Sequence, residues 1–352
     1  MDLPVVWFLL IAVLWTGYLV LEGFDFGAGM LLPVLDRDRT GHRDDRRRRV
    51  LINSIGPVWD GNEVWLLVAG GATFAAFPEW YATLFSGFYL PLLLILLALI
   101  VRGVAFEWRG KVDDPRWRAR CDLAIIVGSF VPAMLWGVAF ANIVAGVPID
   151  AEKQFTGTLF TLLNPYALLG GLTTLTLFAL HGAVFLALKT GGEVGEDAGR
   201  LAQRLSVPTL VIAGAFAVWT QLAHGKAWTW LAVLVAASAL VAVVQASRAR
   251  AEGRAFALTC ATIVAAVVLL FGSLFPDVMP STTDPAISLT ITNASSTPYT
   301  LQVMTWVALG LTPFVLLYQG WTYWVFRQRI TVDAIPPHAG LAPSTRRRAP
   351  QA

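Results

Sequence analysis

The sequence predicts an all-α protein that crosses a membrane many times. Of its 352 residues, 56% are hydrophobic and only 14% are charged, and the mean hydropathy is +0.63. Soluble domains carry about 25% charged residues, so a water-soluble fold would leave much of this apolar surface uncovered. The apolar runs are long and continuous rather than alternating, which favours membrane helices over a membrane barrel.

Nine segments are long enough to span a bilayer, at about 20 apolar residues each. The predicted spans are 4–32, 54–74, 79–101, 122–145, 163–188, 205–223, 228–247, 256–275 and 302–326. We expect two four-helix bundles plus one peripheral helix. The first apolar segment lacks a basic leader and a small-residue cleavage site, so we interpret it as a retained span.

The basic residues predict the orientation of the chain. Of the 26 Lys and Arg, 24 fall on one side of the predicted spans, and only Lys153 and Lys226 fall on the other. The positive-inside rule makes the first side cytoplasmic, with the N-terminus outside and the C-terminus in the cytoplasm. We expect residues 1–330 to form one integral-membrane domain and residues 331–352 to form a disordered basic tail.

Several classes of function lack the residues that they need. Cys121 and Cys260 have no metal-ligand spacing, and the chain has no phosphate-binding loop of the Gly-x-x-x-x-Gly-Lys-Ser/Thr kind. The net charge of +3 comes from residues that flank spans, so we expect no nucleic-acid partner.

The histidines argue against a haem held by this chain alone. Only His181, among four histidines, lies deep within a predicted span, whereas a haem with two histidine ligands needs a facing pair. A hydrogen-bonded His181 packed between helices is favoured over a ligand shared with another chain. We therefore expect no metal site in this chain.

Carboxylates on predicted spans are the candidates for chemistry. Asp60 and Glu63 are three residues apart, as are Glu22 and Asp25, so each pair lies on one helical face. Ionisable groups in membrane helices are costly and mark buried pairs or wet paths. For Asp60 we favour a functional role, because a carboxylate at a hydrated helix start can take a proton and pass it inward.

A structural interpretation of these charges competes with the functional one. Arg102 ends a predicted span and Glu107 follows it, so acids and arginines near the cytoplasmic rim can pair and anchor helix ends. For Glu22, Glu107 and Arg102 both interpretations stay open. In the functional interpretation, Trp59 and Trp65 form walls beside the carboxylates.

Small residues on two predicted spans favour close helix contact. Gly23 and Gly27 are four residues apart on the first span, and Gly70 and Gly71 are adjacent on the second. Without a β-carbon, such positions let two membrane helices approach closely.

Several stretches of the chain form a recognisable set. They are 21–30 (LEGFDFGAGM), 53–65 (NSIGPVWDGNEVW), 69–72 (AGGA), 85–89 (FSGFY), 102–109 (RGVAFEWR), 128–132 (GSFVP), 304–308 (MTWVA) and 313–326. In these stretches, and in order over nearly all of residues 1–330, the chain resembles one known family, subunit II of the cytochrome bd quinol oxidases of bacteria.

This resemblance implies a multi-pass subunit of a terminal oxidase in the bacterial cytoplasmic membrane. The expected partner is a homologous subunit I, which would carry two haems b and one haem d and oxidise quinol. The complex is expected to reduce oxygen to water and to build a proton gradient without pumping. A small accessory subunit, membrane lipid and a quinone in this subunit are further expectations, and no motif here locates that quinone.

The resemblance also implies roles for individual carboxylates. The aspartate of the Trp-Asp-Gly-Asn motif, Asp60 here, is expected to begin a cytoplasmic proton path to the haem site. The position of Glu63 is often glutamine in the family, and that of Glu107 is commonly aspartate. With Asp25, these residues form the expected path, supported by Trp59, Trp65, Arg102 and Glu22.

Two other functions compete with the oxidase. A proton-coupled secondary transporter would have inverted repeats, broken helices and charges at the midplane, whereas the charges here are expected at the cytoplasmic rim. A purely structural scaffold for subunit I is the third possibility.

Overall fold

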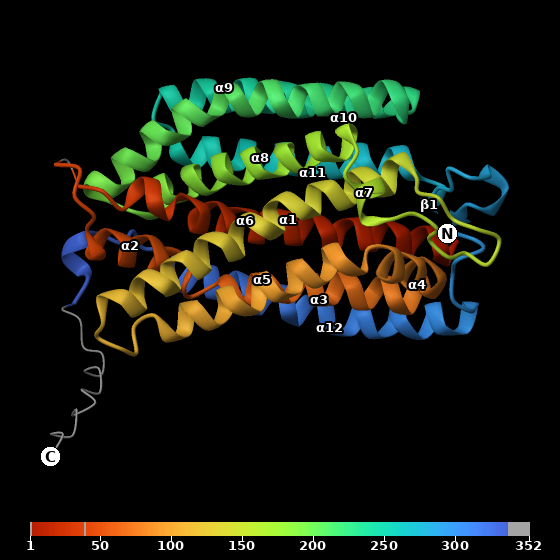
Figure 1. Cartoon of the computed structure of the whole chain (residues 1–352), viewed down its shortest axis with the longest axis horizontal. Helices are drawn as coiled ribbons and strands as arrows, with labels where there is room; N and C mark the ends of the chain where they lie inside the picture. The colour runs from red at the N-terminus through yellow and green to blue at the C-terminus, as the bar shows by residue number, and fades with distance from the viewer. Residues whose placement is uncertain (1, 39, 337–352) are drawn as a thin grey trace, which may run out of the picture.

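The computed structural model describes residues 2–38 and 40–336 and shows long, nearly parallel helices (Figure 1). The first half contains α1 (Leu3–Leu35), α2 (Asp45–Ile55), α3 (Trp59–Ala76), α4 (Pro78–Gly87), α5 (Tyr89–Trp108), α6 (Pro115–Ala145) and α7 (Leu159–Leu162). The second half contains α8 (Pro165–Lys189), α9 (Gly192–Ala223), α10 (Trp230–Arg248), α11 (Glu252–Leu274) and α12 (Pro298–Val325). Short strands β1 (Asp277–Met279) and β2 (Leu289–Thr290) pair antiparallel before α12.

The predicted all-helical membrane fold is confirmed, and the count of nine spans remains a prediction. Among the described residues, eight helices are long and apolar enough to cross a membrane. They are α1, α5, α6, α8, α9, α10 with the short turn before it, α11 and α12. The predicted span 54–74 falls mainly on α3, which has 18 residues and is not among the eight. The predicted span 79–101 is divided at Phe88 into α4 and α5.

The helices α1 and α8 cross the centre of the molecule, where glycines let them touch. A β-carbon on Gly27 would lie 2.0 Å from the backbone oxygen of Phe178, and one on Gly182 would lie 2.5 Å from Gly27. Close packing at Gly27 is therefore confirmed. A β-carbon added at Gly70 or Gly71 would meet no neighbouring atom of the described residues within 4 Å, so these residues make no close helix contact at that pair.

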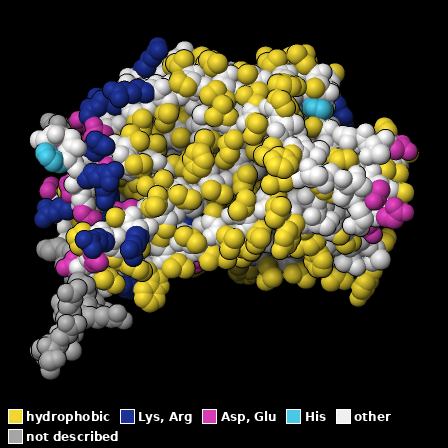
Figure 2. Space-filling model, viewed as in Figure 1, with side chains coloured by type: hydrophobic (Ala, Val, Ile, Leu, Met, Phe, Trp, Pro, Cys, Tyr) yellow, Lys and Arg dark blue, Asp and Glu magenta, His cyan; other side chains and the backbone are white. Residues whose placement is uncertain are grey.

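Charged side chains divide the surface into zones (Figure 2). An apolar band crosses the middle of the molecule, and Lys and Arg side chains gather mainly at one end. We call this the basic end. It contains the ends of α1, α5, α8, α10 and α12 and the starts of α2, α6, α9 and α11. An apolar belt with a basic border is typical of a membrane protein.

An ion-pair network ties four helix ends together at the basic end. Arg109 Nε donates to Asp122 Oδ1 at 2.5 Å, and its Nη2 donates to Asp45 Oδ1 at 2.7 Å. Arg48 donates to Asp36 at 2.8 Å and to Asp122 at 3.0 Å. Partial burial alone would raise the pKa of Asp45, but the hydrogen bond and charge of Arg109, together with the charges of Arg118 and Arg49, outweigh it and lower that pKa. The stabilisation from Asp45 is therefore present at neutral pH and is lost only as the pH falls through this lowered value.

The last helix, α12, lies at the edge of the molecule. Within α12, which is described throughout, only Leu301 is buried. Near its start, Trp7 Nε1 donates to the Leu301 carbonyl at 3.2 Å and to Thr305 Oγ1 at 3.1 Å. Because α12 buries so little of its surface, polar contacts contribute much of its attachment to α1 and α3.

Removing the shared carboxylate of the ion-pair network is expected to destabilise the protein. Asp122 is buried and accepts hydrogen bonds from two arginines. Asp122→Asn should therefore lower the free energy of unfolding by about 3 kcal/mol, because Arg109 and Arg48 lose the negative charge that they share. Thermal unfolding of the purified protein measures this loss. The matched control is Asp113→Asn, in the more exposed pair with Arg118, which should cost under about 1 kcal/mol. Equal melting temperatures for the two variants would contradict the prediction.

Candidate functional site

Three charged side chains meet in the interior, two on α1 and one on α5. Glu22, Asp25 and Arg102 each have 0% of their surface exposed. Arg102 Nη1 donates to Glu22 Oε1, which makes a buried ion pair. The Arg102 guanidinium lies over the rings of Phe26 and Phe106, at 4.8 and 5.2 Å from their centroids. Cation–π contact and ion pairing together hold the guanidinium in one place.

A glycine on α6 makes room for this arginine. A β-carbon on Gly128 would lie 2.6 Å from Arg102 Cβ and 2.7 Å from the Ala98 backbone oxygen. Its neighbour Ser129 is fully buried and closes against Gly29 of α1. The small residues of α6 therefore allow α5 to bring its arginine to the carboxylates of α1.

The cluster lies deeper than the rim position expected from the sequence. Glu22 is thirteen residues before the end of α1 at Leu35, which corresponds to about 20 Å along the helix. The prediction was wrong on depth because α1, at 33 residues, continues well past the length that a bilayer needs. Its final turns, rather than its charged turns, form the basic end.

An asparagine of α3 connects the cluster to α12. Asn62 is fully buried, and its Nδ2 donates to Asp25 Oδ2 at 2.7 Å. Asn62 Oδ1 accepts from the Tyr323 hydroxyl at 2.7 Å and from Gln319 Nε2 at 3.3 Å. Gln319 Oε1 in turn accepts from Trp65 Nε1 at 2.8 Å. The amides thus form a directed chain from Trp65 through Gln319 and Asn62 to Asp25.

Asn62, Gln319 and Tyr323 were not among the residues predicted from the sequence. Their signal was present, because Gln319 and Tyr323 are four residues apart and share a face of an otherwise apolar helix. Asn62 lies within the stretch 53–65 that carries the family resemblance, but the candidates in that stretch are its two carboxylates and its two tryptophans.

The cluster contains more hydrogen-bonding capacity than the chain satisfies. Four buried atoms have no partner among the described residues: Glu22 Oε2, Asp25 Oδ1, and Nε and Nη2 of Arg102. The cluster also has two carboxylates for one guanidinium. Buried polar groups are nearly always satisfied, so this arrangement needs ordered water, an additional proton, or both.

The two carboxylates of α3 that were predicted to form a proton path differ in burial. Asp60 is exposed in the first turn of α3, and Glu63 is half-buried one turn further on. Glu63 interacts electrostatically with Glu22, Arg102 and Asp60. It is therefore within electrostatic reach of both the surface carboxylate and the buried cluster.

The remaining predicted residues lie on the border of the cluster or away from it. The Trp59 ring lies 5.3 Å from the ring of Phe106, whose other contact is Arg102. Trp65 contributes through its bond to Gln319. Glu107 is exposed near the end of α5 and is not brought into the buried cluster.

His181 is fully buried on α8, and both of its ring nitrogens are engaged. Nε2 lies 3.0 Å from the Val20 carbonyl oxygen, to which it must donate, and Nδ1 lies 2.7 Å from Thr259 Oγ1. The ring also stacks on Phe256 with centroids 4.9 Å apart. An iron ligand needs a nitrogen lone pair free of other bonds, so His181 in this geometry does not fit haem ligation.

These features define the class of protein: a multi-pass helical membrane protein with a buried, ionisable cluster linked to one end. The family of cytochrome bd terminal oxidase subunit II matches residues 3–326. Cytochrome bd ubiquinol oxidase subunit 2 of Bacillus subtilis is 44% identical over 331 residues, covering 92% of this chain and 96% of that protein. Cytochrome bd-I ubiquinol oxidase subunit 2 of Escherichia coli K12 is 37% identical over 368 residues, covering 94% and 96%. The chain therefore belongs to the subunit II family of cytochrome bd terminal oxidases.

A solved structure supports the fold independently. The chain matches a bd oxidase chain from Geobacillus thermodenitrificans with a TM-score of 0.73, covering 92% of this chain and 99% of that chain. The identity is 18%, so this likeness concerns the fold alone. The resemblance inferred from the sequence motifs is confirmed, and the secondary-transporter alternative receives no support.

The buried ion pair is expected to be essential for folding unless both charges are removed. Arg102→Met should abolish assembly, because it leaves two carboxylates in the interior with no cation. Arg102→Met combined with Glu22→Gln should recover part of the assembled protein, since the double variant removes both partners. Size-exclusion yield of the purified complex measures both variants. A double variant no better than Arg102→Met would show that the two side chains act independently.

Substitution of His181 should affect packing rather than haem. His181→Ala removes two buried hydrogen bonds and a stacked ring, so the melting temperature should fall. The haem absorption bands per assembled complex should stay at the wild-type level, because neither ring nitrogen is free. Loss of one haem from a complex that is otherwise intact would show that His181 is a ligand shared with another chain.

Proposed function

We propose that this chain is the second subunit of a quinol-oxidising, oxygen-reducing complex in the bacterial cytoplasmic membrane. Its family membership and the names of its relatives support this assignment. In this proposal a partner subunit I holds two haems b and one haem d and oxidises quinol. The chain itself binds no haem, which is consistent with the engaged nitrogens of His181.

We further propose that the chain admits cytoplasmic protons through Asp60. The observation that carries this proposal is the arrangement of carboxylates from the surface to the interior, with exposed Asp60, half-buried Glu63 and buried Glu22 in electrostatic contact in that order. Glu107, exposed at the same end, collects protons at the surface. The basic end is cytoplasmic in this proposal, by the positive-inside rule.

The chemistry of the buried cluster suits proton transfer in steps. Asp25 and Glu22 both interact with the single positive charge of Arg102, so the cluster has one more carboxylate than it has cations. The unpartnered oxygens of both carboxylates provide places for water to deliver that proton. Asn62 fixes one oxygen of Asp25 and leaves the other free to exchange. The haems belong to the partner, so no redox step takes place on these residues.

Asp60→Asn tests the proton path, because it keeps the size of the side chain and removes its titratable proton. Oxygen consumption per haem d should fall at least about tenfold, while haem content and assembly stay normal. Asp60→Glu should keep part of the activity. Glu79→Gln is the matched control, since Glu79 also lies in the first turn of a helix but at the opposite end, beside Lys153.

The competing structural role predicts the reverse result. If Asp60 anchors a helix end, Asp60→Asn should reduce the amount of assembled complex and leave oxygen consumption per haem d at the wild-type value. Among the described residues Asp60 forms no ion pair that could serve as such an anchor. Unchanged turnover in Asp60→Asn would remove Asp60 from the path.

A further inference from the structure

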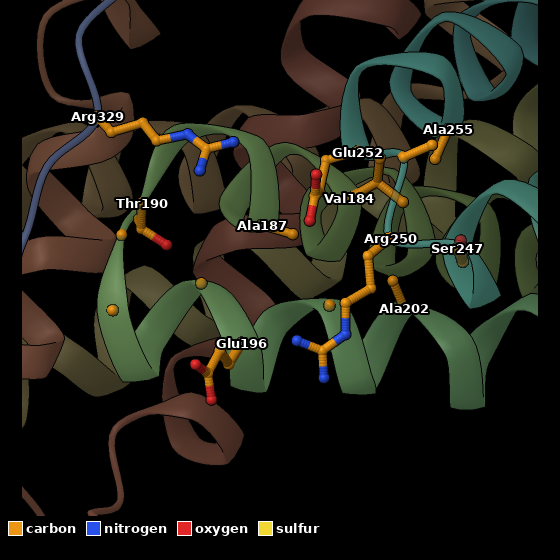
Figure 3. Close-up of a pocket in the computed structure, with 15 residues that line it drawn as sticks. Val184, Ala187, Thr190, Glu196, Ala202, Ser247, Arg250, Glu252, Ala255 and Arg329 are labelled. Carbon is orange, nitrogen blue, oxygen red and sulfur yellow. The ribbon is translucent and has the colours of Figure 1, made fainter.

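A second site lies at the basic end, formed by elements separate from the carboxylate cluster. A cavity of about 240 Å³ opens where α8 passes into α9 and where α10 passes into α11 (Figure 3). Its deep wall is apolar and is formed by Val184, Ala187, Ala202 and Ala255, all of them buried. Its rim is polar. A cavity with an apolar interior and a polar rim at the membrane border is suited to bind the headgroup end of a lipid.

Two arginines reach the rim from different segments. Arg329 comes from the segment after α12, and Arg250 comes from the turn between α10 and α11 (Figure 3). Neither guanidinium forms an ion pair with another residue in the part of the chain that the structure describes. Arg250 has a φ of +52°, a helix-end conformation in which glycine is usual. The fold therefore places beside one cavity two arginines that form no ion pair among the described residues.

Further hydrogen-bond donors line the same cavity. Ser247 is only 7% exposed, and its hydroxyl has no hydrogen-bond partner within the described protein. The cavity also meets the first turns of α9 and α11, whose N-cap residues, Gly191 and Ala251, provide no side-chain cap. By contrast, α2 and α6 begin at the same end with caps from Asp44 and Asp114. Uncapped helix starts attract anions through their free backbone amides.

The carboxylates at the rim restrict which anion fits. Glu196 pairs with Arg200 at 3.7 Å on the outer surface. Glu252 lies in the first turn of α11 and lines the cavity between the two arginines in Figure 3. A purely anionic ligand would be repelled by Glu252, whereas a ligand with a phosphate and a primary ammonium would satisfy the arginines and the glutamate together.

We propose that this cavity binds the phosphoethanolamine headgroup of a membrane phospholipid. The phosphate lies toward Arg250, Arg329 and the Ser247 hydroxyl, and the ammonium lies toward Glu252. The apolar deep wall and the place of the cavity at the ends of membrane helices favour a lipid over free phosphate, which has no apolar part to bury. The proposal is independent of the proton path, because the cavity shares no residue with it.

The test uses the assembled oxidase complex, stripped of lipid by detergent and supplied with one phospholipid at a time. Native mass spectrometry counts the bound lipid, and thermal unfolding measures stabilisation. Phosphatidylethanolamine should bind and raise the melting temperature more than phosphatidylcholine, whose quaternary ammonium cannot donate to Glu252, or phosphatidylglycerol, which has no cation. Millimolar inorganic phosphate should have no effect.

Substitutions assign the effect to this cavity. Arg250→Gln with Arg329→Gln should lower the affinity for phosphatidylethanolamine at least tenfold. The matched control is Arg327→Gln, because the Arg327 guanidinium stacks over Trp324 outside the cavity. Glu252→Gln should shift the preference toward phosphatidylglycerol.

Ser247→Ala is the sharpest variant, because it removes a hydroxyl that has no hydrogen-bond partner among the described residues. With no ligand in the cavity, this change should leave stability unchanged or raise it. With the phosphate bound there, it should lower lipid affinity about tenfold. Equal lipid retention in the wild type and the double arginine variant would overturn the proposal. Stabilisation by inorganic phosphate alone, or by phosphatidylglycerol as strongly as by phosphatidylethanolamine, would also overturn it.

Discussion

The buried ion pair between Arg102 and Glu22 constrains much of the rest of the structure. Each ion buried away from water costs several kcal/mol, and only a close partner with good geometry offsets that cost. Gly128 must stay small so that α5 can approach α6, and the rings of Phe26 and Phe106 must cover the guanidinium. Asp25 then adds a second carboxylate that the single arginine cannot fully neutralise. The excess acid leaves the site able to accept a proton.

The sequence predicted the fold class and the charged residues well, because both depend on local composition. Apolar runs identify membrane helices wherever they occur, and a carboxylate such as Asp25 within one is conspicuous. The number of spans was harder to predict, because the break at Phe88 and the short α3 depend on how the chain reverses at one end. Hydropathy averages over such features, so 54–74 and 79–101 had the composition of two complete spans.

The partners of the charged residues could not be predicted, because they come from distant parts of the chain. Asn62 meets Asp25 across 37 positions and Tyr323 across 261, and no local pattern specifies either contact. Gly27 and Gly70 looked alike in sequence, yet only Gly27 faces another helix of this chain. Which face of a membrane helix is covered depends on tertiary packing, since lipid and protein interior are similarly apolar.

The amide chain also gives α12 a role in the properties of the cluster. This helix buries almost no side chain, so the bonds from Gln319 and Tyr323 to Asn62 contribute much of its attachment to α3. The Nδ2 atom of the same Asn62 amide donates to Asp25, so a displacement of α12 changes the hydrogen bonding of a buried carboxylate. In the proposed complex, a subunit that covers the apolar surface of α12 would exclude water from these amides and strengthen them. Assembly and the proton affinity of Asp25 are then coupled through Asn62, with no direct contact between the partner and the carboxylate.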